Sequence, residues 1–137
     1  MFDLVIDAKP DNYRLFEKRN SDPKFDKFRE QILERDNYQC QFCNFTSKKH
    51  MHVVNLNGNY FDNRTTNLVS ACPLCSQCLF IDMCGKYENS GGSIIYLPEI
   101  SQKDLNALSH VIFLAQNLEP DMRKVANNIL NSLKLRT

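Results

Sequence analysis

Apolar residues recur at steps of three and four in three stretches of the chain, the spacing that places them along one side of an α-helix. The first stretch follows Ser21-Asp22-Pro23, where side chains that can cap a helix precede a proline near the first helical position. We therefore predict an amphipathic helix over residues 23–36, with its apolar side packed on the core. Its apolar positions are Phe25, Phe28, Ile32 and Leu33.

The other two stretches lie near the C-terminus. Ser101 is followed three residues later by Asp104, which resembles a capping box, and a long apolar helix face follows. Pro120 breaks this helix and can begin the next one, so we predict helices over 101–117 and roughly 120–134. The apolar positions are Leu105, Leu108, Val111, Ile112 and Ala115 in the first helix, and Met122, Val125, Ala126, Ile129, Leu130 and Leu133 in the second.

Shorter apolar runs indicate strands. Residues 4–6 could form one, and residues 93–97 read as another that Pro98 ends. Asn57-Gly58, between Val53-Val54 and Tyr60-Phe61, predicts a tight hairpin turn. The glycines within 85–92 predict a mobile loop. The chain is therefore expected to be of the α+β class.

Composition adds limits to this picture. A length of 137 residues suits one domain, and an apolar content of 42% suffices for an ordinary core. No apolar run approaches the roughly 20 residues that a membrane helix needs, and the N-terminal region lacks the pattern of a secretory signal. We expect a soluble cytosolic protein. The net charge of +1 gives no overall attraction to nucleic acid.

Six cysteines are the one unusual feature of the composition. Disulfides are rare in the cytosol, so metal binding is favoured there. Two CxxC pairs, Cys40 with Cys43 and Cys72 with Cys75, are typical of zinc knuckles. Four thiolates complete a tetrahedral shell and leave no position open for water, which predicts one structural zinc ion per chain. Four buried thiols or a redox pair are the alternatives.

Two cysteines are left over. Cys78 could compete as a ligand, but we expect it on a helix that starts at the second knuckle. Cys84 is expected to be a buried or loosely held thiol.

The segment 38–80 resembles the core of HNH endonucleases, in which a ββα unit stands beside a CxxC…CxxC zinc site. By this resemblance, His52 matches the general base and Asn67 the central asparagine. The acidic metal ligand is replaced by Met51, and the last ligand by Ser76. A thioether and a neutral hydroxyl are poor ligands for Mg²⁺, so we expect His52 to be a surface or hairpin residue. His50 could rotate into the site, which leaves a nuclease possible.

A closer resemblance, to the IcmJ/DotN family, spans about residues 28–136 with order and spacing kept. The Tyr96-Leu97-Pro98-Glu99 run after a glycine-rich loop has no place in a generic nuclease core. The matching pieces are Arg35-Asp36-x-Tyr38-x-Cys40-Gln41-Phe42-Cys43, Val54-Asn55-Leu56-x-Gly58, Asn63-Arg64-x-x-Asn67-Leu68-Val69, Cys75-x-Gln77-Cys78, Ile95-Tyr96-Leu97-Pro98-Glu99 and Leu105-Asn106-x-Leu108-x-His110-Val111.

That family belongs to the Dot/Icm type IVB secretion system of intracellular bacteria. The resemblance implies a non-catalytic cytoplasmic subunit of the coupling complex, which is held at the inner membrane through its partner. The partner would be the C-terminal tail of the coupling ATPase, beside other adaptors, and the subunit would assist effector recruitment. Apolar positions beyond those the core needs, such as Phe113, Leu114 and Leu118, predict that the tail binds across an apolar groove of the two C-terminal helices. The alternative is that these helices pack on each other and on the helix over 23–36.

The layout expected from these observations is a single domain over 1–137. An N-terminal helix (21–37) precedes an HNH-like zinc core (38–84), and a strand with two helices (93–137) follows. A metal-dependent HNH nuclease and a non-catalytic zinc module that binds nucleic acid are the alternative functions. The missing metal ligands disfavour the first of these, and the near-neutral charge disfavours both.

Overall fold

The computed structural model describes residues 1–86 and 91–137. Its helices are α1 (Asn12–Asn20), α2 (Pro23–Arg35), α3 (Pro73–Cys78), α4 (Gln102–Ala115) and α5 (Pro120–Lys134), with 3₁₀ turns at Thr65–Asn67 and Ile81–Met83. Its strands are β1 (His52–Asn55) and β2 (Leu68–Ala71). Helices together with a small two-stranded sheet confirm the α+β class. The part of the chain that the structure describes has no helix long and apolar enough to cross a membrane.

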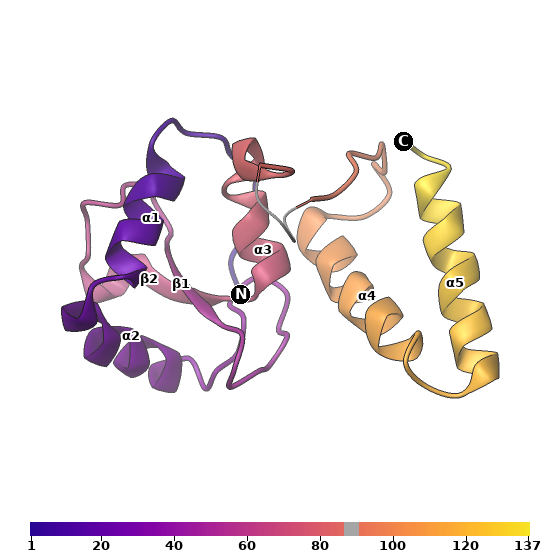
Figure 1. Ribbon diagram of the computed structural model, residues 1–137, viewed down its shortest axis with the longest axis horizontal. Helices are drawn as coiled ribbons and strands as arrows, with labels where there is room; N and C mark the ends of the chain where they lie inside the picture. The colour runs from indigo at the N-terminus through magenta and orange to yellow at the C-terminus, as the bar shows by residue number, and fades with distance from the viewer. Residues whose placement is uncertain (87–90) are drawn as a thin grey trace.

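The sheet forms the centre of the N-terminal body, where α1 and α2 cover it and α3 follows it directly (Figure 1). β1 and β2 are antiparallel, with His52 opposite Ala71 and Asn55 opposite Leu68. The loop between them therefore runs over 56–67. The predicted tight hairpin between Val53-Val54 and Tyr60-Phe61 is wrong.

The long loop replaces that hairpin because asparagine side chains hold it in place. Gly58 adopts a left-handed φ of 67° in a turn closed by its N–H to the Asn55 carbonyl at 3.1 Å. Asn67 donates to the carbonyl of Asp62 and to the Asn57 side chain, each at 2.9 Å. Tyr60 is buried as part of this loop rather than as part of a strand.

The predicted helix over 23–36 is confirmed as α2. Asp22 caps it by accepting from the Lys24 N–H at 3.0 Å, and Pro23 occupies the first turn. Helix α1 was not predicted. It is fastened by Arg19, whose guanidinium donates to Asn55 and, at 2.6 Å, to the Val53 carbonyl, and lies 4.6 Å from the centre of the Phe25 ring.

The N-terminal segment 1–9 is extended but forms no strand, so the strand considered for 4–6 is wrong. It nevertheless crosses the domain. The Phe2 N–H donates to the Gln41 carbonyl at 2.8 Å, and the Asp7 N–H donates to the Cys78 carbonyl at 2.9 Å. In return, the Ile81 N–H donates to the Asp7 carbonyl at 3.1 Å.

Residues 93–97 do not form the predicted strand either. No strand of the described residues pairs with them, and the Tyr96 N–H instead bonds the Arg136 carbonyl at 3.1 Å. Half of the predicted mobile loop, residues 87–90, lies outside the described residues.

Helices α4 and α5 form an antiparallel pair beside this body, with α4 next to α3 (Figure 1). Both predictions of a helix are confirmed, and Ser101 caps α4 by accepting from the Asp104 N–H at 3.3 Å. Buried Ile112 and Ala126 mark the packed side of the two helices. Much of the remaining apolar surface of the pair is exposed.

Candidate metal centre

The first cysteine pair is shaped by a tight loop. The Cys40 N–H donates to the Phe45 carbonyl at 2.8 Å, and the Asn44 N–H returns to the Cys40 carbonyl at 3.0 Å. Asn44 closes the turn in a left-handed conformation, with a φ of 65°, which asparagine tolerates better than most residues. This loop directs the side chains of Cys40 and Cys43 to the same side.

The second pair lies where β2 passes into α3. Cys72 caps α3, and Pro73 after it favours the first helical turn. The Cys75 N–H donates to the Cys72 sulfur at 3.4 Å. Helix α3 ends at Cys78, so this cysteine lies on the helix where it was expected, within its last turn.

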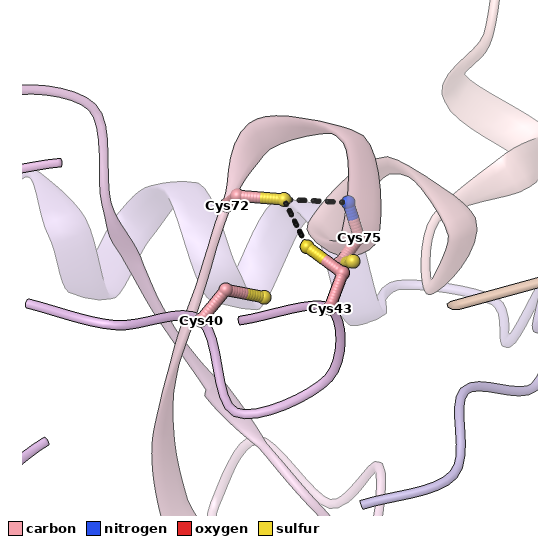
Figure 2. A group of neighbouring side chains, drawn as sticks. All are labelled: Cys40, Cys43, Cys72 and Cys75. Atoms are coloured by element: carbon pink, nitrogen blue, oxygen red, sulfur yellow. Dashed lines mark hydrogen bonds between the residues drawn. The ribbon is translucent and has the colours of Figure 1, made fainter. Parts of the chain in front are cut away.

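The two pairs face one another (Figure 2). All four sulfur atoms lie within 4.8 Å of one another, and those of Cys43 and Cys72 are 3.6 Å apart. None of the six cysteines forms a disulfide. Buried sulfurs at these distances, carried by two CxxC turns, fit the tetrahedral thiolate shell of a structural zinc ion.

The protonation of these thiols shows why a cation suits the cluster. Hydrogen bonds from the Cys43, Cys72 and Cys75 side chains lower the pKa of Cys40. Hydrogen bonding to Cys40 and Cys43 raises the pKa of both Cys72 and Cys75. Not all four thiols can ionise together without a compensating charge. A divalent cation would supply that charge in place of the shared protons.

The residues that match the catalytic positions of the nuclease core are not part of the four-cysteine cluster. His52 begins β1, and its Nδ1 lies 2.8 Å from the Ser76 hydroxyl, while Phe16 of α1 packs against the imidazole with ring centres 5.6 Å apart. Burial lowers the pKa of His52. Met51 is 1% exposed within the core, and Asn67 holds the loop between the strands.

Cys84 lies outside the four-cysteine cluster, as expected for a surplus thiol. It is half-buried and accepts from the Gln77 side-chain amide at 3.0 Å. Across the described residues, the four-cysteine cluster is the one group of three or more His, Cys, Asp or Glu side chains placed to hold a metal ion.

Two residues that contact the cluster were not recognised from the sequence. Asn106 and His110 on α4 place side-chain nitrogens 3.3 Å from the Cys75 sulfur and 3.2 Å from the Cys72 sulfur. The available signal was their spacing of four residues within a helix whose other residues are mostly apolar.

The sequence of the chain is similar to that of a known protein. No family model matches the chain. Over 135 residues, 98% of its length, it is 41% identical to the type 4 apparatus protein DotN of Legionella pneumophila, and it spans 63% of the length of that protein. The chain is thus a homologue of DotN, which confirms the resemblance of its motifs to the IcmJ/DotN family.

Proposed function

We propose that this protein is a non-catalytic, zinc-stabilised component of a type IV secretion apparatus. The observation that carries the proposal is its identity of 41% with DotN over almost the whole chain. We assign it to the coupling complex of a type IVB system. There it binds the C-terminal tail of the coupling ATPase, stands beside other secretion adaptors and assists effector recruitment. It lies in the cytoplasm and reaches the inner membrane through that partner.

The surroundings of His52 support a role without catalysis. Metal-dependent cleavage of a phosphodiester needs hard oxygen ligands near the histidine. The corresponding positions hold Met51, which is packed in the core, and Ser76, whose hydroxyl lies 2.8 Å from the imidazole and also donates to the Pro73 carbonyl at 3.1 Å. Phe16 covers part of the same imidazole. His52 therefore acts as a structural residue between β1, α1 and α3.

Nicking of supercoiled plasmid in Mg²⁺, Mn²⁺ or Ni²⁺ tests this part of the proposal. We expect no cleavage above a buffer control. Robust cleavage that disappears in His52→Ala would make the protein an HNH nuclease. Tight binding of DNA without cleavage, lost as salt is raised, would instead make it a nucleic-acid-binding zinc module.

The C-terminal helix pair supplies the surface that we assign to the ATPase tail. Helical spacing places Met122, Val125 and Ile129 along one side of α5, and their exposed fractions are 52%, 56% and 38%. A second stripe runs along α4. Exposed apolar stripes of this kind often mark a binding surface. The α4 stripe consists of Val111 and Leu114, and the exposed Leu118 follows in the connection to α5.

Co-purification with the tail of the coupling ATPase tests the partner, and calorimetry tests the surface. An apolar contact requires a negative heat-capacity change on binding. Val125→Asp should weaken binding at least about tenfold, since it places a charge in the stripe. Asn131→Asp, on the opposite side of α5, is the matched control. Binding that collapses with salt, has little heat-capacity change and is unaffected by Val125→Asp would exclude this surface.

A further inference from the structure

Helix α4 turns a polar stripe, rather than its apolar residues, towards the cysteine cluster. Gln102, Asn106 and His110 follow one another at steps of four, so they lie along one side of the helix. Asn106 is 5% exposed, which is unusual for an amide unless its hydrogen bonds are made. Ile112 is also buried, but helical spacing places it on a different side of α4 from Asn106 and His110.

The Asn106 side chain is oriented by its neighbours. Its oxygen accepts from the Gln102 side-chain amide at 2.9 Å, so its nitrogen faces the cysteines. That nitrogen lies 3.3 Å from the Cys75 sulfur and 3.6 Å from the Cys78 sulfur. Asn106 therefore offers an N–H group to a sulfur of the cluster, on a helix that is remote in sequence.

His110 makes the second contact, one helical turn later. Its Nε2 lies 3.2 Å from the Cys72 sulfur. The imidazole stacks on the ring of Phe45, with centres 3.8 Å apart and planes 4° from parallel. Phe45 belongs to the loop of the first knuckle, so both cysteine pairs contribute to the surface that receives this histidine.

Other contacts between α4 and the N-terminal body are modest. Ala107 packs against the buried core, and Lys103 pairs with Asp3 at 2.9 Å, but Asp3 is almost fully exposed. An exposed ion pair contributes little to stability. The two N–H contacts to sulfur are therefore the distinctive part of the attachment.

We infer that Asn106 and His110 are outer-shell residues of the metal centre and that they dock the α4–α5 pair on the metal-loaded cluster. The inference rests on the zinc ion proposed above. Four thiolates carry more negative charge than one zinc ion neutralises, so the sulfurs are good acceptors for N–H donors. Such outer-shell donors orient the ligands and strengthen metal binding. The position of the apolar surface on α4 and α5 thereby depends on metal occupancy at a site remote from it.

Three variants of the whole chain test the inference. His110→Phe keeps the ring on Phe45 but removes the N–H group, and Asn106→Leu keeps the volume but removes the amide. His110→Gln restores an N–H at similar reach. Asn131→Leu, an exposed position on α5, controls for the chemical change itself. The measurements are zinc content, zinc affinity by chelator competition, and hydrogen exchange along the chain.

We expect one zinc ion in every variant. His110→Phe and Asn106→Leu should lower zinc affinity about 10- to 100-fold, the usual effect of losing an outer-shell partner. Amides of α4 and α5 should exchange faster, while those of β1 and β2 stay protected. His110→Gln should recover much of the loss, and Asn131→Leu should match the wild type.

The outcomes separate this inference from the zinc assignment beneath it. If both removals leave zinc affinity and exchange in α4 and α5 unchanged, the contacts are incidental and the inference is overturned. If His110→Gln behaves like His110→Phe, donation by His110 is excluded. If the wild-type protein binds no zinc, the zinc assignment fails and this inference fails with it.

Discussion

Replacing Cys72 with serine should remove most of the folding stability of this protein. The Cys72 sulfur is fully buried at the junction of β2 and α3. It lies 3.6 Å from the Cys43 sulfur and accepts the Cys75 N–H at 3.4 Å. A serine hydroxyl occupies less space and does not provide the thiolate that a structural zinc site uses. The substitution thus disrupts the point at which the two knuckles meet.

The magnitude follows from the small amount of regular secondary structure around the cluster. The sheet has two strands of four residues each, and the first knuckle adds an isolated bridge between Gln39 and Thr46 and a bond from the Gln41 N–H to the Ser70 carbonyl at 2.9 Å. Structural zinc contributes about 10–16 kcal/mol in small zinc domains, and it does so as folding free energy. Typical domains are stable by about 5–15 kcal/mol. Loss of the ion would remove a contribution of about 10–16 kcal/mol, which matches the whole stability of a typical domain, so little net stability would remain.

Urea unfolding together with elemental analysis measures the effect. Cys72→Ser should lose zinc and lack a cooperative transition. Cys84→Ser is the matched control, because Cys84 lies outside the cluster and its contact with the Gln77 amide can be kept by a hydroxyl. Its cost should stay below about 1 kcal/mol, with one zinc retained. If Cys72→Ser unfolds at the same urea concentration as the wild type, the zinc-centred account of the fold is refuted.

Three further changes probe other parts of the structure. Arg19→Met should lower the free energy of unfolding, measured with urea, by about 2–4 kcal/mol, because charged hydrogen bonds and a cation–π contact are lost. Zinc content should not change, and a decrease below about 1 kcal/mol would contradict this account. Burial raises the pKa of Tyr60 to about 12, above the value of about 10 in an unfolded chain, so its stability contribution is full below about pH 10 and lost as pH rises towards 12. In Tyr60→Phe, the fall in the free energy of unfolding at alkaline pH should be about 2 kcal/mol smaller than in the wild type, as measured from urea midpoints at a series of pH values. If the two proteins lose stability equally as pH rises, Tyr60 is not the source of the loss. Ile112→Ala should lower the free energy of opening of α5, measured by hydrogen exchange, by about 2–4 kcal/mol and leave zinc affinity unaltered. A fall in zinc affinity would mean that the packing of α4 on α5 and its docking on the cysteine cluster are not independent.

The elements predicted from the sequence are those with local signals. Helix α2 begins with Asp22 and Pro23, α4 with Ser101 and α5 with Pro120, and each signal acts within one helical turn of its own residue. The four cysteines were equally readable as candidate ligands, because each CxxC pair shapes its own loop. In the structure these sulfurs converge within 4.8 Å of one another.

The elements that were missed or misplaced depend on distant partners. Helix α1 begins after Asp11, which has a left-handed φ of 66° and makes no side-chain cap, unlike Asp22 before α2 and Ser101 before α4. Arg19 anchors this helix to β1, but the sequence alone indicates only an ordinary solvent-exposed charge at this position. Residues 93–97 have strand-like composition, yet the structure places no strand among the described residues next to them.

Helix α4 illustrates a third case, in which the apolar pattern located the helix but did not indicate which of its sides faces the rest of the protein. Apolar periodicity located the helix, and a helix is normally expected to turn that side towards the core. Here the side facing the N-terminal body carries Asn106 and His110, because the surface that receives it includes sulfur atoms that accept hydrogen bonds. Composition alone does not reveal such a surface.

The path of the N-terminal segment has a consequence for synthesis of the protein. Asp7 is held between Cys78 and Ile81, so during translation it can meet these partners only after the segment that contains them has left the exit tunnel. The last of the four clustered cysteines, Cys75, emerges just before that point, and α4 follows later. The two knuckles can therefore close before Asp7 binds between Cys78 and Ile81, and α4, which lies later in the chain, can dock on the cluster only after the knuckles have been made.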